Sequence, residues 1–300
     1  MCIRDRQYIA EGYEYVVDMD LEKYFDRVNH DMLMGRIAKR VEDKRMLRLI
    51  RAFLNAGAME NGLVRSPQGK GVPQGGPLSP LLSNLFLDDL DRELERRGHR
   101  FVRYADDCNI YVRTERAGHR VMEGVKGYLK RKLKLKVNEK KSAVDKANKR
   151  KFLGFSVIWS RNGNPLRSIA PTSLERFKER IRRMTRRQCG CSIEQLVEDL
   201  KPYLVGWRGY FGFCETPWEL RDLDGWIRRR LRSVIWEQWT TYRRRRNALR
   251  QLGVAFLKAM DAAWKGCESN STWKMSRDPC VQRALSPKYF DEIGLPRLAK

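Results

Sequence analysis

Two clusters of aspartates could carry chemistry in this sequence. In VVDMDLEKYFD, Asp18 and Asp20 lie two residues apart, so along a strand over 13–21 they share one face. In RFVRYADDCNIYVR, Asp106 and Asp107 stand between two apolar runs that predict a strand, a tight turn and a second strand. Aspartate is also common in ordinary turns. If the first strand pairs beside the hairpin, however, Asp20 can face Asp106 and Asp107. These three carboxylates would repel one another unless Mg²⁺ lies between them. Two such ions could support in-line phosphoryl transfer.

A third segment, VPQGGPLSP, could approach a ligand through its backbone. Gln74 offers a flat amide, and the glycine pair that begins at Gly75 lets the main chain come close to a bound molecule. The helix that follows could direct its N-terminus at phosphate. The simpler interpretation is a loop leading into a helix, with Ser79 as the N-cap and Pro80 at the first helical position.

The order of the expected elements predicts an α+β fold, an antiparallel sheet backed by helices. These elements are a strand over 13–21, two helical stretches within 30–56, a helix from Ser79 to Gly98, the hairpin over 101–114, a basic helix near 117–133 and a strand over 151–159. The Gly- and Pro-rich residues 57–77 predict a loop or short hairpin. After Pro171 the sequence is mostly helical and rich in arginine. We therefore expect two domains, 1–165 and 166–300.

The net charge indicates a polyanionic partner. The chain has 62 Lys and Arg against 37 Asp and Glu, a surplus of +25. Nucleic acid is the usual partner of such a chain. An anionic membrane would favour one basic amphipathic helix, whereas here the basic residues run along the whole sequence. No window is long and apolar enough for a membrane span. The seven cysteines show neither zinc spacing nor a convincing disulfide framework, which indicates reduced thiols.

Basic residues are concentrated in the helical half of the chain. Residues 171–250 contain 19 Lys and Arg against 10 Asp and Glu. Consecutive like charges repel unless a partner counters them, and arginine beside aromatic rings suits RNA. The neighbouring tryptophans are expected to be core residues at helical spacing. The predicted RNA-binding arginines are Arg182, Arg183, Arg186, Arg187, Arg228, Arg229, Arg230, Arg243, Arg244, Arg245 and Arg246.

Five motifs, taken in order, resemble the successive palm motifs of reverse transcriptases. They are DxxxxFD, PQGGPLSP, YADD, LKLKVNEKKS and FLGF. The run from PQGGPLSP to YADD is most similar to group II intron-encoded enzymes. The region after Pro171, with YLVGWRGYFG, resembles their thumb or maturase-specific domain. The resemblance covers about residues 7–300. It implies a right-hand polymerase palm followed by a helical thumb, and an RNA-directed DNA polymerase that also binds its intron RNA to assist splicing and mobility.

The resemblance assigns a role to each aspartate of the predicted cation site. Asp20 corresponds to the first metal ligand, and Asp106 and Asp107 to the pair supplied by the YADD hairpin, together holding two Mg²⁺ ions. Phe25 falls where the family places the aromatic ring that abuts the sugar of the incoming nucleotide. A ring there would exclude a 2′-hydroxyl and favour deoxynucleotides. Phe25 could equally be a core aromatic residue, and both roles are compatible.

Further positions match contacts of the family with nucleotide and primer. Gln74 and Gly75 match contacts to nucleotide and template. Lys141 corresponds to a lysine that could neutralise or protonate leaving pyrophosphate, although Lys140 is adjacent and either side chain could simply be solvated. FLGF (152–155) matches a strand and turn that grip the primer, with ordinary sheet core as the alternative.

The sequence also departs from the family and leaves alternatives open. Only about a dozen residues precede the first strand, so we expect an N-terminally truncated chain that lacks most of the fingers and that could be weak or inactive as a polymerase by itself. MCIRDR could be a non-native stub. No Cys/His endonuclease motif is present. The alternatives are an RNA-binding splicing maturase without polymerase activity, a reverse transcriptase of a defence or diversity-generating system, and a merely basic nucleic-acid binder. The expected partners are intron RNA, a DNA primer and dNTPs, with no membrane, in a bacterial cytoplasm. The oligomeric state is left open.

Overall fold

The computed structural model describes most of the chain as two compact units. The described residues are 2–56, 58–60, 63–65, 69–73, 76–186, 190–269 and 271–299. The two units are Met1–Pro165 and Leu166–Lys300, and each is considered by itself below. Because Gln74, Gly75 and Arg187 lie outside the described residues, their predicted roles are left as predictions.

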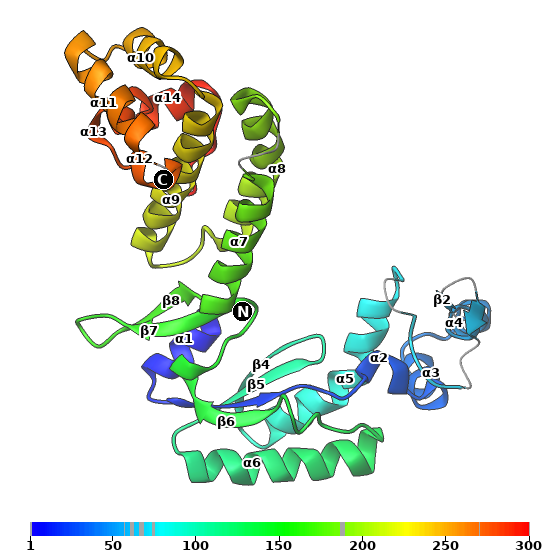
Figure 1. Cartoon of the computed structure of the whole chain (residues 1–300). Helices are drawn as coiled ribbons and strands as arrows, with labels where there is room; N and C mark the ends of the chain where they lie inside the picture. Colours follow the sequence, from blue (N-terminus) through cyan, green and yellow to red (C-terminus); the bar gives the residue numbers. More distant parts are fainter. Residues whose placement is uncertain are drawn as a thin grey trace. The chain divides into compact units, whose positions relative to one another are not determined.

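The first unit combines helices with a central sheet (Figure 1). Its elements are α1 (Cys2–Ala10), β1 (Tyr15–Met19), α2 (Tyr24–Arg27), α3 (His30–Ala38), α4 (Lys44–Asn55), β2 (Ala58–Glu60), β3 (Leu63–Arg65), α5 (Ser79–Arg96), β4 (Arg100–Tyr104), β5 (Asp107–Val112), α6 (Glu115–Tyr128), a π-helical turn (Leu129–Leu133), β6 (Ala143–Lys146), a 3₁₀ turn (Ala147–Lys149) and β7 (Phe155–Trp159). This arrangement confirms the expected α+β class.

The central sheet has four antiparallel strands in the order β4-β5-β1-β6. The strand that carries Asp18 thus lies between the YADD hairpin and β6. Along β1 the pairing with β5 runs from Tyr15 opposite Val112 to Met19 opposite Cys108. Register is fixed over the whole strand because a shift by one residue would turn every side chain to the other face.

The two faces of this sheet pack against different elements. Val17 and Ile110 belong to the larger core, which includes buried leucines of α5 and the buried Val125 of α6. Figure 1 shows α6 running along the sheet beneath β6. On the opposite face, Val16 and Tyr111 pack with Ile9 of α1 in a smaller cluster. Alternation of side chains along the strands therefore separates the two cores.

The helix α1 and the strand β6 were not among the elements expected from the sequence. The helix α1 packs on β4, and the side chain of Asp5 is buried. The strand β6 was not predicted, and it completes the edge of the sheet beside β1. Its short sequence AVDK has too few apolar residues to show a strand period, so only pairing with β1 defines it.

The helix after the glycine loop begins where predicted but is capped differently. Ser79 is the first residue of α5, the N-cap position is Leu78, and no side chain caps the helix. The hydroxyl of Ser79 instead donates a hydrogen bond to the carbonyl of Pro73. Ser79 therefore ties the loop to the helix rather than satisfying the first free N–H groups of the helix, so the predicted N-cap is wrong.

The second unit is almost entirely helical (Figure 1). Its elements are β8 (Pro165–Ile169), α7 (Pro171–Met184), α8 (Ile193–Phe211), α9 (Pro217–Gln238), α10 (Tyr242–Gln251), α11 (Phe256–Glu268), α12 (Thr272–Met275), α13 (Pro279–Ala284) and α14 (Pro287–Glu292). Trp236 is fully buried, and Trp226 and Trp239 pack against the same core. The expectation that these tryptophans are core residues is therefore confirmed.

Among the described residues, no helix combines the length and the apolar character that crossing a membrane requires. Among the described cysteines, Cys108, Cys214, Cys267 and Cys280 are free thiols.

Candidate active site

The register of the sheet brings Asp20 beside the hairpin tip. Met19 pairs with Cys108, so the next position on each strand places Asp20 alongside Asp107. The same alternation puts Asp18 opposite Asn109 on that face. Asp20 lies immediately after β1 and its side chain is 21% exposed. The open end of one sheet face thus carries acidic side chains from two neighbouring strands.

The YADD turn itself is tight and braced. Tyr104 pairs with Asp107, which leaves Ala105 and Asp106 as a two-residue turn. Ala105 has a positive φ of 54°. This conformation is energetically unfavourable for any residue other than glycine. The carbonyl of Ala105 accepts a hydrogen bond from Arg103 at 2.8 Å, and Arg103 also binds Asp91 of α5. The strained turn is therefore anchored to the helix behind it.

The electrostatic environment shows that the aspartates lie within reach of one another. Burial raises the pKa of Asp106, and the charge of Asp20 raises it further. Burial also raises the pKa of Asp107, and the negative charges of Asp106, Asp20 and Asp18 raise it further. Lys141 opposes both shifts. Mutual repulsion of this kind is relieved by a cation bound among the carboxylates.

The segment KVNEKKS holds Asp20 in place. The backbone N–H of Asp20 donates to the Ser142 hydroxyl at 3.0 Å, and its carbonyl accepts from the backbone of Asn138 at 2.8 Å. The Nζ atom of Lys141 lies 3.6 Å from Oδ1 of Asp20, and its side chain is 68% exposed. Lys141 therefore lies beside the predicted metal ligand, with most of its side chain in contact with solvent.

Asp18 is not available to the same degree as Asp20. Its Oδ2 accepts hydrogen bonds from Nε and a terminal nitrogen of Arg150, at 2.9 and 2.5 Å. The same guanidinium donates to the carbonyl of Lys141 at 3.0 Å. Burial raises the pKa of Asp18, and Arg150 opposes that shift. This pair links β1 to the segment that carries Lys141, so Asp18 and Arg150 position the site.

The donor set suits a hard divalent cation. Asp20, Asp106 and Asp107 supply carboxylate oxygens, which Mg²⁺ prefers, and the charge of Lys141 lowers the pKa of both Asp106 and Asp107. In the described part of the chain, no three His, Cys, Asp or Glu side chains converge closely enough to form a complete metal site. Metal ligation by these three residues therefore stays a prediction.

Phe25 lies in α2, five residues beyond Asp20. Its ring is partly buried against the larger core and meets Tyr24 edge-on, with ring centroids 5.2 Å apart. Its carbonyl accepts a hydrogen bond from the backbone of Val72, at the start of the VPQGGPLSP loop. The core role considered for Phe25 is thus present, and its exposed part leaves the predicted nucleotide contact open.

FLGF forms a tight hairpin turn. Phe152 and Phe155 exchange two backbone hydrogen bonds of 2.9 and 3.0 Å, and Leu153 and Gly154 between them both have positive φ. Two consecutive positive φ values are the pattern of a type I′ turn, which suits a short connection between antiparallel segments. The predicted contact with primer is not tested by this geometry.

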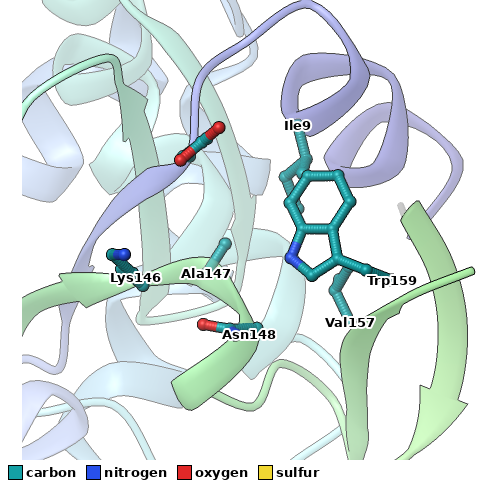
Figure 2. A pocket seen from close by; sticks show the side chains of 7 residues that line it. Ile9, Lys146, Ala147, Asn148, Val157 and Trp159 are labelled. Carbon is teal, nitrogen blue, oxygen red and sulfur yellow. The ribbon is translucent and has the colours of Figure 1, made fainter. Parts of the chain in front are cut away.

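A small cavity of ≈ 280 Å³ lies in the sheet unit, between α1, the end of β6 and β7. Figure 2 shows the indole of Trp159 between Ile9 of α1 and Val157 of β7, with Lys146 and Asn148 on the opposite wall. Trp159 is 44% exposed. None of the three aspartates lines this cavity, so it is separate from the candidate active site.

The predicted RNA-binding arginines divide into two groups, of which the first is engaged within the protein. Arg182 and Arg183 of α7 pair with Glu175 and Glu179 on the same helix. Arg245 donates to the carbonyls of Trp239 and Gly266, both at 2.8 Å. Arg230 donates two hydrogen bonds to Thr185, one to the hydroxyl oxygen at 2.7 Å and one to the carbonyl oxygen at 3.1 Å. Arginines of this group brace helices as well as adding charge.

The arginines of the second group lie at the surface or along a cavity. Arg186, Arg243 and Arg244 are exposed, whereas Arg246 is half-buried with its guanidinium 5.9 Å from the ring of Tyr242. Arg228 and Arg229 line a cavity together with Arg232 and Arg277, neither of which was among the predicted RNA-binding residues. The signal for Arg232 was its helical spacing from Arg228 and Arg229. Arg277, 45 residues further along the chain, gave no signal that could be recognised in the sequence.

Sequence comparison assigns both halves of the chain. Residues 3–157 match the family "Reverse transcriptase (RNA-dependent DNA polymerase)". Residues 174–253 match "Group II intron, maturase-specific domain". Both matches agree with the motifs and with the division between a sheet unit and a helical unit.

Individual relatives cover parts of the chain. Protein YkfC of Escherichia coli is 31% identical over 183 residues, which is 49% of this chain and 48% of that protein. The group II intron-encoded protein LtrA of Lactococcus lactis is 27% identical over 222 residues, 52% of this chain and 37% of LtrA. A putative COX1/OXI3 intron 2 protein of Saccharomyces cerevisiae is 36% identical over 83 residues, 28% of this chain and 10% of that protein. The chain therefore spans about half or less of these relatives.

Proposed function

Because this chain belongs to the reverse transcriptase family, and carries the maturase-specific domain of group II introns, we propose that it copies RNA into DNA for such an intron. We propose further that its helical unit binds the intron RNA and assists splicing and mobility. What supports the proposal is the position of Asp20, Asp106 and Asp107 at the same end of two neighbouring strands, with Nζ of Lys141 3.6 Å from Asp20.

In the proposed reaction, the 3′-oxygen of a DNA primer attacks the α-phosphorus of a dNTP, and pyrophosphate leaves. Asp20, Asp106 and Asp107 would hold two Mg²⁺ ions. When bound, these ions supply Lewis-acid stabilisation of the attacking and leaving oxygens. The carboxylates have the necessary charge, and the repulsion among them favours cation binding.

The other residues of the site have roles that follow from their positions. Lys141 lies 3.6 Å from Asp20, where its ammonium group would neutralise the leaving pyrophosphate. The partly exposed ring of Phe25 would pack against the sugar of the dNTP and exclude a 2′-hydroxyl. Arg150 holds Asp18 and the Lys141 carbonyl, so it keeps β1 and the lysine segment in one arrangement.

A polymerase-deficient maturase is the alternative function. It predicts RNA binding and splicing without DNA synthesis. Loss of polymerase function would be expected to remove acidic ligands, and all three aspartates are present in this chain. We therefore favour the active polymerase.

The direct test is primer extension by the full chain on poly(rA) with an oligo(dT) primer, with and without Mg²⁺. We expect Mg²⁺-dependent synthesis that Asp106→Asn abolishes, because this substitution removes a carboxylate charge while keeping the size of the side chain. Binding of RNA, measured by fluorescence anisotropy, should be largely unchanged. Asp31→Asn is the matched control, because Asp31 is an exposed carboxylate on α3.

Two results would contradict the proposal. Synthesis by Asp106→Asn at the wild-type rate would remove this aspartate from catalysis. RNA binding and splicing by the wild type without any DNA product would favour the polymerase-deficient maturase.

A further inference from the structure

The helical unit contains a cavity of ≈ 370 Å³ whose walls are rich in arginine. One wall is a single face of α9, because Gly225, Arg228, Arg229 and Arg232 follow one another at helical spacing. The volume lies within the range of about 300–1,000 Å³ that is usual for ligand pockets. The cavity is therefore large enough to hold a ligand and is not a packing defect.

The opposite wall adds a fourth positive charge and no negative one. It comes from the segment 276–287, which contributes Arg277 and Gln282. Among the described residues, no carboxylate lines the cavity. Arg297 lowers the pKa of Asp291, and the charge of Arg228 lowers it further. Within the described residues, none of the four arginines forms an ion pair.

The arginines repel one another inside this cavity. Burial lowers the pKa of Arg229, and the charge of Arg277 lowers it further. Burial likewise lowers the pKa of Arg232, with an added effect from Arg228. Arginine stays charged at all ordinary pH values, so the repulsion persists unless an anion binds. The protein thus maintains an uncompensated positive site.

Two of these side chains are held in fixed positions. Arg232 is only 8% exposed, and its Nε donates to the carbonyl of Leu285 at 2.9 Å. No hydrogen bond within the described residues uses its two terminal nitrogens. Arg229 stacks 3.8 Å from the ring centroid of Trp273 and donates to Ser276 at 3.3 Å. Fixed guanidinium groups lose little freedom when they bind a ligand.

Gly225 keeps one side of the cavity open. A Cβ atom at this position would meet nothing within 4 Å, so no contact within the described protein requires glycine. Glycine in a helix interior is less favourable than alanine. An open position beside four arginines is compatible with a ligand that approaches the backbone of α9.

We propose that this cavity binds a phosphate group of the RNA backbone. Planar guanidinium groups match phosphate in a bidentate manner, and several of them converge here. The inference rests on the RNA binding proposed above for the source of the phosphate, while anion binding by the cavity can be measured independently. The proposal also assigns different roles to neighbouring arginines. Arg228 and Arg229 line the cavity, whereas Arg230 binds Thr185.

The principal test is Gln282→Glu in the full chain. This substitution keeps the size of the side chain but replaces the amide that donates to the Arg277 carbonyl at 2.8 Å with a carboxylate. Released from that carbonyl, the carboxylate should pair with the arginines of the cavity and displace phosphate. We expect binding of a fluorescein-labelled 20-nucleotide RNA at 150 mM KCl to weaken about tenfold or more. The salt dependence should also fall, by about 0.7 in log–log slope for each phosphate of single-stranded RNA that the variant no longer neutralises. Gln251→Glu is the matched control, since Gln251 is exposed on α10 and changes the net charge equally.

A second measurement separates RNA from free phosphate. Inorganic phosphate should raise the melting temperature of the wild type above that in chloride of the same ionic strength, and Gln282→Glu should remove this difference. Arg277→Gln should act in the same direction, and Arg277 is exposed, so its replacement should not unfold the chain. Circular dichroism checks folding of each variant.

Three results would overturn the inference. Equal weakening of RNA binding by Gln282→Glu and Gln251→Glu would reduce the effect to net charge. Stabilisation by inorganic phosphate, together with unchanged RNA binding in Gln282→Glu, would make the cavity a site for free phosphate. No stabilisation by phosphate and no selective loss of RNA binding would leave no phosphate site at all. Failure of the wild type to bind any RNA would instead contradict the proposed function.

Discussion

The brace between Arg103 and Asp91 should control the position of the YADD turn. Arg103 donates to Asp91 through two nitrogens at 2.7 and 2.5 Å, to the Ala105 carbonyl at 2.8 Å and to Asn84 at 3.1 Å. Its side chain is 9% exposed and that of Asp91 is 25% exposed. Arg103→Gln removes the charge and most of these bonds, and it leaves the Asp91 carboxylate without its partner.

The expected cost follows from the number and burial of these bonds. Hydrogen bonds to charged groups contribute about 1.5–3 kcal/mol each, and breaking a well-buried pair costs about 3–5 kcal/mol. Because Asp91 keeps some contact with water, we expect Arg103→Gln to destabilise the hairpin by about 3 kcal/mol, at the lower end of that range. The equilibrium for local opening should then rise by about 100-fold.

Hydrogen–deuterium exchange with mass spectrometry measures this opening in the full chain. Peptides that cover β4 and β5 should exchange about 100-fold faster in Arg103→Gln. Asp91→Asn should have a similar effect, and the double variant should cost about 2 kcal/mol less than the sum of the single variants. Primer extension should fall in parallel while RNA binding stays unchanged.

The exposed pair between Arg96 and Glu93 on the same helix provides a control for the Arg103–Asp91 pair. Arg96→Gln removes an exposed arginine of α5 that pairs with Glu93, and it should leave exchange in the hairpin unchanged. Additive effects of Arg103→Gln and Asp91→Asn would show that the two residues are not coupled. Unchanged exchange in β4 and β5 would refute the conclusion that this brace holds the turn.

Three further predictions concern stability and substrate choice. Burial raises the pKa of Asp5 from its ordinary 3.8 to about 6. Its contribution to stability should therefore be largest below pH 4 and be lost as the pH rises through 6, a loss on the order of 3 kcal/mol that Asp5→Asn should abolish in urea unfolding. Gly266→Ala should destabilise α11 by about 1–2 kcal/mol, because the new Cβ would lie 2.5 Å from the Trp236 ring. Gly206→Ala is the control: its Cβ would meet nothing within 4 Å, so the substitution should raise the melting temperature. Phe25→Ala should increase incorporation of ribonucleotides relative to deoxynucleotides in primer extension, and an unchanged ratio would refute the sugar contact.

Local pattern in the sequence predicted the elements near the site and the chemistry they present. The apolar runs on either side of the two aspartates of YADD predicted the hairpin, and Ser79, Pro80 and Gly98 predicted where α5 begins and ends. Because strand side chains alternate with a period of two, the spacing of Asp18 and Asp20 placed both on one face. The sequence order of the motifs also identified the family that the comparisons show.

Tertiary structure decided which groups these residues meet. The sequence indicates only that Asp91 is a polar residue of a helix. It becomes the partner of Arg103 because α5 packs behind the hairpin. The pairing of β6 with β1 brings Ser142 to Asp20 across 122 residues. Arg228 and Arg230 read alike in sequence, yet one lines a cavity and the other binds Thr185. Long-range contacts such as these depend on packing between distant segments, for which a single sequence carries no periodic signal.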